Sequence, residues 1–349
     1  MTGAASGTEP WNPVRLATTE KGMQMMEKTV CNQFVWRLFA STTAMFATMA
    51  ILAFSPAIAE EPLSQESFGS PQQAVAALVA AVKADNDTEL LAILGPDAED
   101  LIYSGDPVAD QNDRARFIKF YEMKNSLEKL GAERTVLLLG GKNFPLPIPL
   151  VQQGDNWIFD TEAGREEILN RRIGKNELHT IEVMHAYTAA QREYACMDRP
   201  GGRQEFAQKF SSSEGKQDGL YWETGENEVA SPFGPLIAKA TEEGYRGRGL
   251  DEIPPEPFYG YYFKILKAQG EHAKGGAFNY VADGKMVLGF ALTAYPAKYG
   301  VSGIMTFIVN QEGVIYEKDL GEETATEAAA IATFDPDSTW RQYKEPAEP

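Results

Sequence analysis

Apolar residues recur at helical spacing in the segment from Ser70 to Gly95. Ser70-Pro71-Gln72-Gln73 is a typical helix start, because a serine N-cap and a proline at the first helical position precede a glutamine that completes a capping box. The apolar residues on one face of this helix are Val75, Leu78, Val79 and Val82. A second short helix is expected from Asp87 to Gly95-Pro96, where a left-handed residue and an imino nitrogen end it.

The next stretch combines a helical pattern with strand-like runs. Apolar residues at helical spacing predict a further helix over residues 110–130. Residues 135–139 and 157–159 are short apolar runs next to turn residues, so we expect antiparallel strands there. Residues 144–150 alternate proline with apolar residues, which suits only an edge strand or an extended segment. Helices followed by a few strands predict a small α+β domain over residues 60–165.

A long helical segment follows over residues 162–195. We expect an interruption at Gly174, after which Asn176 is placed to cap the second part of the helix. Residues 200–257 contain many Gly, Pro and Glu and few large apolar residues after position 223. This composition predicts an irregular insertion on the surface.

The final third of the chain is rich in strand patterns. Strands are expected at residues 261–267, 286–295, 306–309 and 314–318, with Asp283-Gly284 as a hairpin turn. A long helix followed by such strands predicts a second α+β domain over residues 166–321, before an acidic tail over residues 322–349. The expected fold class is therefore α+β, with two small domains that each pack helices on an antiparallel sheet.

Residues 1–59 have the features of a cleavable signal peptide. The basic residue Arg37 precedes an uncharged apolar stretch from Leu38 to Phe54, and the small residues Ala57 and Ala59 follow it. A basic region, an apolar region and a small-x-small site are typical of a secretory leader. We expect signal cleavage after Ala59, which gives a periplasmic or secreted protein.

The sequence disfavours two alternatives to a cleavable leader. An uncleaved membrane anchor is disfavoured, because the stretch contains several hydroxyl side chains and Pro56 breaks it. Lipoprotein attachment is disfavoured, because no cysteine stands at the cleavage position. Met23, Met25 or Met26 would give a more compact basic region, so we expect the true start of translation there.

Composition and charge narrow the class of protein. With 43% hydrophobic and 23% charged residues, the chain has the composition of a globular protein. The net charge of −18 argues against binding to nucleic acid or to anionic lipid surfaces, since such binding depends on Lys and Arg. Cleavage of residues 1–59 removes four Lys or Arg and three Asp or Glu, so the acidity belongs to the mature protein.

Metal and disulfide chemistry find little support. Cys31 lies in the leader and Cys196 is alone afterwards, so no intramolecular disulfide forms after cleavage, and we expect Cys196 to be a buried small residue. No Cys or His spacing is typical of zinc. Asp106, Asp110 and Asp113 could offer oxygens to Ca²⁺, but they lack the EF-hand pattern, and helix capping explains Asp110. We therefore assign no metal and no cofactor.

The sequence also gives little evidence for catalytic residues. The three histidines are His179, His185 and His272. His185 follows Ile181 by four positions, which places it partly buried beside the apolar face of its helix. Glu166 or Glu167 with Arg171 has the spacing of an ion pair on a helix surface. No catalytic residue is assigned.

Several segments of the second half resemble a known family. The resemblance rests on Gly260-Tyr261-Tyr262-Phe263, Gly289-Phe290-Ala291-Leu292, Tyr295-Pro296, Tyr299-Gly300 and Thr306-Phe307-Ile308-Val309-Asn310. This combination resembles a family of exported bacterial proteins catalogued as a domain of unknown function (DUF2950-like). The resemblance covers nearly all of the mature chain and implies no activity.

A second resemblance concerns the fold. The helix with Asn176-Glu177 and Ala190-Gln191, followed by the Gly260-Tyr261 strand and the segment from Tyr299, looks like the globular head of type IV pilin-like proteins. That resemblance implies one helix packed on an antiparallel sheet. The hydrophobic N-terminal helix and prepilin-peptidase site of pilins are not found, so polymerisation is not expected. On pattern alone, the first domain resembles the cystatin or nuclear-transport-factor class.

These observations lead to two functional hypotheses. The first is a non-enzymatic binding or interaction module of the envelope, with Trp222, Tyr261, Tyr295 and Tyr299 as a candidate binding surface for an envelope protein or a cell-wall glycan. No stable membrane insertion is expected after cleavage. The alternative is a periplasmic hydrolase or small-ligand-binding protein that uses a pocket in the first domain. An enzyme would need several titratable groups that converge in one cleft.

Overall fold

The computed structural model describes most of the chain beyond the expected leader. The described residues are 64–197, 204–225, 229–245 and 256–345. The expected cleavage residues Ala57 and Ala59 lie outside these ranges. Within the described ranges, no helix is long and apolar enough to cross a membrane.

The described residues belong to one compact unit that begins at Ala59. Its buried hydrophobic side chains form two clusters. We call the first cluster, between Phe68 and Phe159, the N-terminal core, and the second cluster, between Ile181 and Phe334, the C-terminal core. The division of the chain into two domains near residue 165 stays a prediction.

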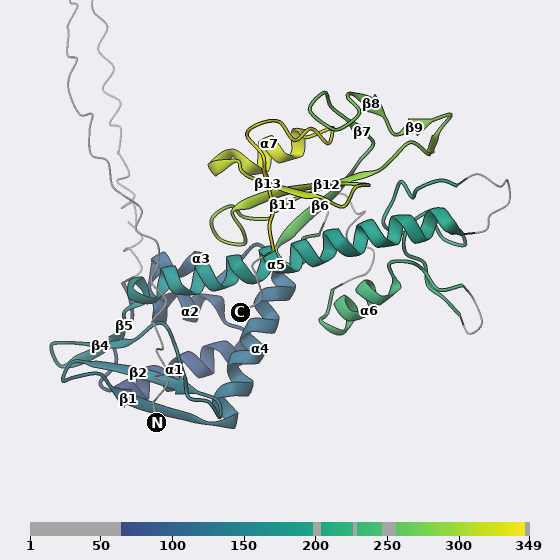
Figure 1. The fold of residues 1–349 in the computed structure, drawn as a ribbon. Coiled ribbons are helices and arrows are strands. Elements are labelled where there is room, and N and C mark those ends of the chain that lie inside the picture. Colours follow the sequence, from purple (N-terminus) through teal and green to yellow (C-terminus); the bar gives the residue numbers. More distant parts are fainter. Residues whose placement is uncertain (1–63, 198–203, 226–228, 246–255, 346–349) are drawn as a thin grey trace, which may run out of the picture. The chain divides into compact units, whose positions relative to one another are not determined.

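The N-terminal core begins with a set of short helices (Figure 1). These are α1 (Pro71–Ala84), α2 (Asp87–Leu94), a 3₁₀ turn η1 (Pro96–Ala98), α3 (Glu99–Ile102) and α4 (Pro107–Met123). The predicted start of α1 is confirmed, because the Ser70 hydroxyl accepts a hydrogen bond from the backbone nitrogen of Gln73. The cap of α2 is Asn86, one residue before the expected Asp87.

An antiparallel sheet completes this part. Its strands are β1 (Asn125–Lys129), β2 (Arg134–Leu139), β3 (Phe144–Pro145), β4 (Leu150–Gln153) and β5 (Asn156–Phe159), in the order β1-β2-β4-β5 with β3 on β2. The expected edge position of the proline-rich segment is confirmed by β3. The helix predicted over residues 110–130 is too long, because it ends at Met123 and Leu127 pairs opposite Leu137 in the sheet.

The longest element is α5 (Thr161–Cys196), which contributes to both cores (Figure 1). It is continuous, so the predicted interruption at Gly174 is wrong. Gly174 has open space around it, and a glycine in a helix costs only about 1 kcal/mol relative to alanine. Asn176 does not cap a helix. It is buried, and its amide donates a hydrogen bond of 2.9 Å to the carbonyl of Ser302.

The C-terminal core lies between α5 and a second antiparallel sheet. The sheet contains β6 (Tyr261–Leu266), β11 (Ala291–Pro296), β12 (Met305–Asn310), β13 (Ile315–Asp319) and β14 (Arg341–Gln342), in the order β14-β13-β12-β11-β6. Two small hairpins, β7 (Ala268–Gln269) with β8 (Phe278–Asn279) and β9 (Val281–Ala282) with β10 (Lys285–Met286), stand beside it. The predicted turn at Asp283-Gly284 is confirmed, since both residues have positive φ angles between β9 and β10.

Two segments expected to be peripheral join this core. Helix α6 (Gly234–Glu242) lies within the predicted surface insertion, and it is seen beside the second half of α5 in Figure 1. Its Ile237 and Ala240 are buried, and the preceding Phe233 is 1% exposed. The expected acidic tail contains a 3₁₀ turn η3 (Gly321–Glu323) and helix α7 (Thr324–Ala330), and its Phe334 is 2% exposed.

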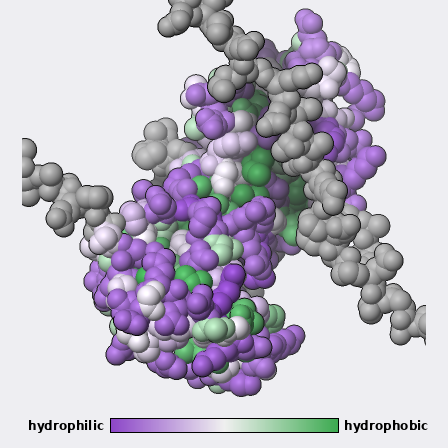
Figure 2. Space-filling view, turned by 90° about the vertical axis from the view of Figure 1, so that its left-hand side faces the viewer, coloured by the Kyte–Doolittle hydropathy of each residue, from purple (hydrophilic) through white to green (hydrophobic). Residues whose placement is uncertain are grey.

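Together these elements make an α+β protein, as the sequence predicts. The face seen in Figure 2 is mostly hydrophilic, with hydrophobic residues gathered in limited patches. In the described part of the chain, the exposed large hydrophobic side chains are Tyr103, Met123, Leu130, Phe144, Leu178, Val229, Phe278 and Leu288. Scattered apolar residues of this kind are normal on a folded protein and do not by themselves mark a binding surface.

Candidate functional site

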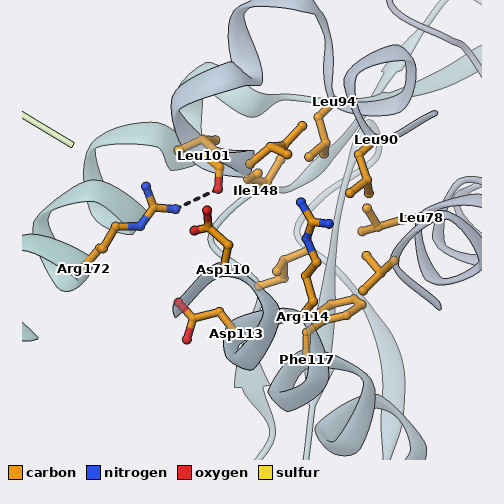
Figure 3. Close-up of a pocket in the computed structure, with 13 residues that line it drawn as sticks. Leu78, Leu90, Leu94, Leu101, Asp110, Asp113, Arg114, Phe117, Ile148 and Arg172 are labelled. Atoms are coloured by element: carbon orange, nitrogen blue, oxygen red, sulfur yellow. Dashed lines mark hydrogen bonds between the residues drawn. The ribbon is translucent and has the colours of Figure 1, made fainter. Parts of the chain in front are cut away.

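The N-terminal core contains an open apolar cavity of about 180 Å³ (Figure 3). Its lining residues are Leu78 and Val82 of α1, Leu90 and Leu94 of α2, Leu101 and Ile102 of α3, Asp110, Asp113, Arg114 and Phe117 of α4, Leu146 and Ile148 before β4, and Arg172 of α5. Five helices and one extended segment therefore supply the wall. Most of the lining is aliphatic or aromatic, so the cavity favours an apolar group.

The helices place these side chains by simple periodicity. Leu78 and Val82 are four residues apart on α1, as are Leu90 and Leu94 on α2, so each pair shares one helix face. Glycine Gly95 ends α2 with a positive φ, and its amide bonds back to the carbonyl of Leu91. The chain can then turn into α3, which closes the cavity.

The charged residues gather on one side. Figure 3 shows Asp110, Asp113 and Arg172 on that side, Leu78, Leu90 and Leu94 on the other, and Arg114 between them. Arg114 forms ion pairs with Asp85 and Asp87. Burial lowers the pKa of the Arg114 guanidinium, but the two carboxylates outweigh this effect and raise its pKa. The guanidinium is therefore held charged and paired.

The other charged groups at the cavity also have partners. The guanidinium of Arg172 donates to the backbone carbonyls of Asp100 at 2.6 Å and Leu101 at 2.7 Å, and burial lowers its pKa. The Asp110 carboxylate accepts from the backbone nitrogen of Ser104 at 3.1 Å, and burial raises its pKa although this bond opposes the shift. Asp113 lies 3.0 Å from Arg116 in an exposed ion pair.

Asp106, the first carboxylate of the candidate calcium loop, has a structural position. It is 0% exposed and caps α4, because its Oδ1 accepts from the backbone nitrogens of Val108 and Ala109. Its Oδ2 accepts from the Tyr245 hydroxyl and from the backbone nitrogen of Gly260, each at 2.8 Å. The cap is thus Asp106 and not Asp110. No group of three or more His, Cys, Asp or Glu within the described ranges is arranged to hold a metal ion.

The four aromatic residues predicted to form a binding surface do not all lie at the surface. Tyr261 is 0% exposed and Trp222 is 7% exposed, so both side chains belong to the C-terminal core, which corrects the expectation that they face a partner. Tyr295 is half-buried against Tyr262, with ring centroids 5.5 Å apart. Tyr299 donates a hydrogen bond to Asp319 at 3.0 Å. Tyr261 is buried because neighbouring side chains along β6 point to opposite faces of the sheet.

Other residues singled out in the sequence lie on the surface. His185 is half exposed, with its Nε2 3.6 Å from a carboxylate oxygen of Glu345, so the expectation of partial burial beside the apolar helix face is wrong. This pair does not line the cavity. Cys196 is free and exposed, which corrects its expected burial. The expected helix-surface ion pair forms between Glu167 and Arg171.

Comparison with known proteins identifies a family but no activity. No curated protein and no solved structure matches the chain. The resemblance of the second half to pilin heads therefore stays a prediction. The model of the family described as Protein of unknown function (DUF2950) matches residues 65–343, and the chain belongs to that family.

Proposed function

We propose that this protein is an exported, non-enzymatic binding protein whose cavity in the N-terminal core takes up an apolar group of a small ligand. The observation that carries the proposal is the open, largely aliphatic cavity in which the charged lining residues are already paired. A ligand that enters it meets leucine, isoleucine and phenylalanine side chains. The favourable term is therefore removal of apolar surface from water.

The size of the cavity limits the group that enters. An apolar cavity of roughly 150 Å³ in another protein holds benzene. The cavity here, at about 180 Å³, accommodates a substituted aromatic ring or a short aliphatic chain. Burial of six carbons at about 0.8 kcal/mol each gives roughly 5 kcal/mol of gross favourable free energy. Polar parts of the ligand would stay at the charged side near Asp113.

The state of the charged groups supports binding more than catalysis. A general acid or base must reach its substrate with a proton to give or accept. At this cavity Asp110 accepts from Ser104, and Arg114 and Arg172 hold acidic or carbonyl partners. These bonds fix the side chains in the wall of the cavity, which suits a structural role for them.

The proposal is tested by titration calorimetry with indole and p-cresol as probes. Leu94 is a half-buried lining residue, so Leu94→Phe should fill the cavity and raise the Kd of either probe at least about tenfold. Leu178→Phe on α5 is the matched control, because Leu178 is exposed and outside the lining, and it should leave Kd unchanged. The proposal fails if neither probe binds, or if the Leu94→Phe variant binds as well as the natural protein.

Export is the second part of the proposal, and the apolar stretch before Ala57 and Ala59 supports it. N-terminal sequencing of protein recovered from the periplasm or the medium should give Glu60 as the first residue. Recovery of an intact leader, or of protein from the cytoplasm alone, would contradict this part and leave the binding experiment unaffected.

A further inference from the structure

The two edges of the N-terminal sheet differ in how they are covered. At one edge, the backbone nitrogen of Phe68 donates to the Trp157 carbonyl of β5 at 2.8 Å, and that of Trp157 donates back at 2.7 Å. At the other edge, β1 pairs with β2 on one side, and no strand or isolated bridge within the described ranges pairs with its other side. Figure 1 shows β1 as the outermost strand of this sheet. Proteins usually cover or blunt such an edge, because its free main-chain groups can pair with another chain.

The direction of the main-chain groups of β1 follows from its bonds to β2. The backbone nitrogen of Gly140 donates to the Lys124 carbonyl at 2.8 Å. At the other end, the backbone nitrogen of Leu130 donates to the Arg134 carbonyl, also at 2.8 Å. Main-chain groups alternate in direction along an antiparallel strand, so every second residue between these two ends points its N–H and C=O groups away from β2. The outward-directed residues are Asn125, Leu127 and Lys129.

The middle of this edge has none of the usual protections against pairing. The strand contains no proline, and its pairing with β2 runs without a bulge. Lys124 and Lys129 stand at its two ends and leave the centre open. Residues 124–129 carry two lysines and one glutamate, so this edge does not share the acidic excess of the chain, whose net charge is −18. Two acidic copies therefore meet little electrostatic repulsion along this strand.

We propose that β1 pairs antiparallel with β1 of a second copy, about a two-fold axis at Leu127, and so joins two N-terminal sheets into one. In this register Leu127 lies opposite itself, and Asn125 lies opposite Lys129 of the second copy. The outward N–H and C=O groups of all three residues then find partners in both copies. A shift along the strand leaves at least one outward residue of each copy beyond the end of the other strand.

The side chains of β1 also suit pairing with a second copy in this register. Ser126 lies opposite Glu128 of the second copy, so no two like charges stand directly opposite each other. Met123 is 59% exposed and Leu130 is 53% exposed, and they flank the strand at its opposite ends. Leu130 of one copy falls opposite Lys124 of the other, next to Met123. The two-fold axis repeats this contact at both ends, which removes four exposed apolar side chains from water.

The experiment is sedimentation velocity on the full mature chain over a range of protein concentrations. The natural protein should show a dimer fraction that grows with concentration. Asn125→Lys places two lysines directly opposite each other twice in the dimer, so it should raise the dimer Kd at least about threefold. Addition of Lys129→Glu to that variant turns both repulsive pairs into attractive ones and should bring the Kd back to the natural value or below it.

A matched control separates pairing at β1 from a general effect of charge. Asn156→Lys makes the same change at an exposed asparagine of β5, on the opposite edge of the sheet, and should leave the Kd within about twofold of the natural value. Circular dichroism checks that each variant is folded. The proposal is overturned if the natural protein stays monomeric up to about 500 µM. It is also overturned if Asn125→Lys and Asn156→Lys have the same Kd, or if Lys129→Glu does not lower the Kd of Asn125→Lys.

Discussion

Replacement of Asp106 by asparagine should destabilise the protein by about 1–3 kcal/mol. The natural carboxylate accepts four hydrogen bonds while fully buried. The asparagine oxygen keeps the two cap bonds, and the Tyr245 hydroxyl can turn to accept from the new amide. The backbone N–H of Gly260 cannot turn, so one buried donor faces another donor and loses its partner. Such a loss costs about 1–3 kcal/mol.

The measurement is equilibrium urea unfolding, followed by tryptophan fluorescence near neutral pH. A total stability of about 5–15 kcal/mol makes the expected loss easy to detect. Asp155→Asn is the matched control, because Asp155 lies exposed in the turn before β5, and its effect should stay within about 0.5 kcal/mol. A loss below about 0.5 kcal/mol for Asp106→Asn would refute the assignment of Asp106 as a junction between α4 and the C-terminal part.

The pH dependence gives an independent check. Burial raises the pKa of Asp106 above its ordinary value of 3.8, although hydrogen bonds from Ala109, Gly260 and Tyr245 oppose the shift. The folded state therefore binds the proton more tightly than the unfolded state, and the natural protein gains stability from this group as pH falls through the raised pKa. Asparagine does not titrate. The stability gap between the two proteins should widen on acidification from neutral pH towards 3.8, and a constant gap would contradict the reasoning.

The remaining predictions concern packing and surface charge. Gly303→Ala should cost about 1–3 kcal/mol in urea unfolding, because its Cβ would lie 2.1 Å from the hydroxyl of the fully buried Tyr261; an unchanged midpoint would disprove this close contact. Gly174→Ala should stabilise the protein by about 0.5–1 kcal/mol if α5 is continuous, and destabilisation would indicate a break there. Arg171→Ala removes an exposed pair with Glu167 and should cost at most about 0.5 kcal/mol, with a loss above about 1 kcal/mol as the contrary result.

Local signals in the sequence were sufficient where each element is defined by its own residues. Ser70 begins α1 through a bond three residues away, and Asp283-Gly284 forms a hairpin because both residues adopt positive φ angles. The wrong predictions concern residues whose secondary structure depends on tertiary contacts. Leu127 has helical spacing from earlier apolar residues, yet it pairs with Leu137 across a sheet. Helix α6 was missed although Pro235 stands in its first turn and Ile237 and Ala240 share one face, because the Gly- and Pro-rich composition around it indicated an irregular insertion.

The candidate sites were less accessible to sequence reasoning than the fold. The alternative hypothesis named a pocket in the first domain but no residue of it, because the wall comes from six separate segments. The sequence did not indicate that Arg114 forms ion pairs, because its partners Asp85 and Asp87 lie almost thirty positions earlier. Alternation along β6 explains why Tyr261 points inwards, whereas the irregular loop around Trp222 has no period from which its burial could be predicted.

The cavity in the N-terminal core depends on residues from far along the chain. Its α3 wall is fixed by Arg172 of α5, which bonds the carbonyls of Asp100 and Leu101, and by Lys298, which lies 2.5 Å from the Asp100 carboxylate. Lys298 follows β11 of the C-terminal sheet, so both parts of the protein hold the same short helix. A fragment that ended before α5 would lose both supports. The shape of the cavity therefore depends on the whole chain, and the proposed ligand binding would need the C-terminal part although no residue of the C-terminal sheet lines the cavity.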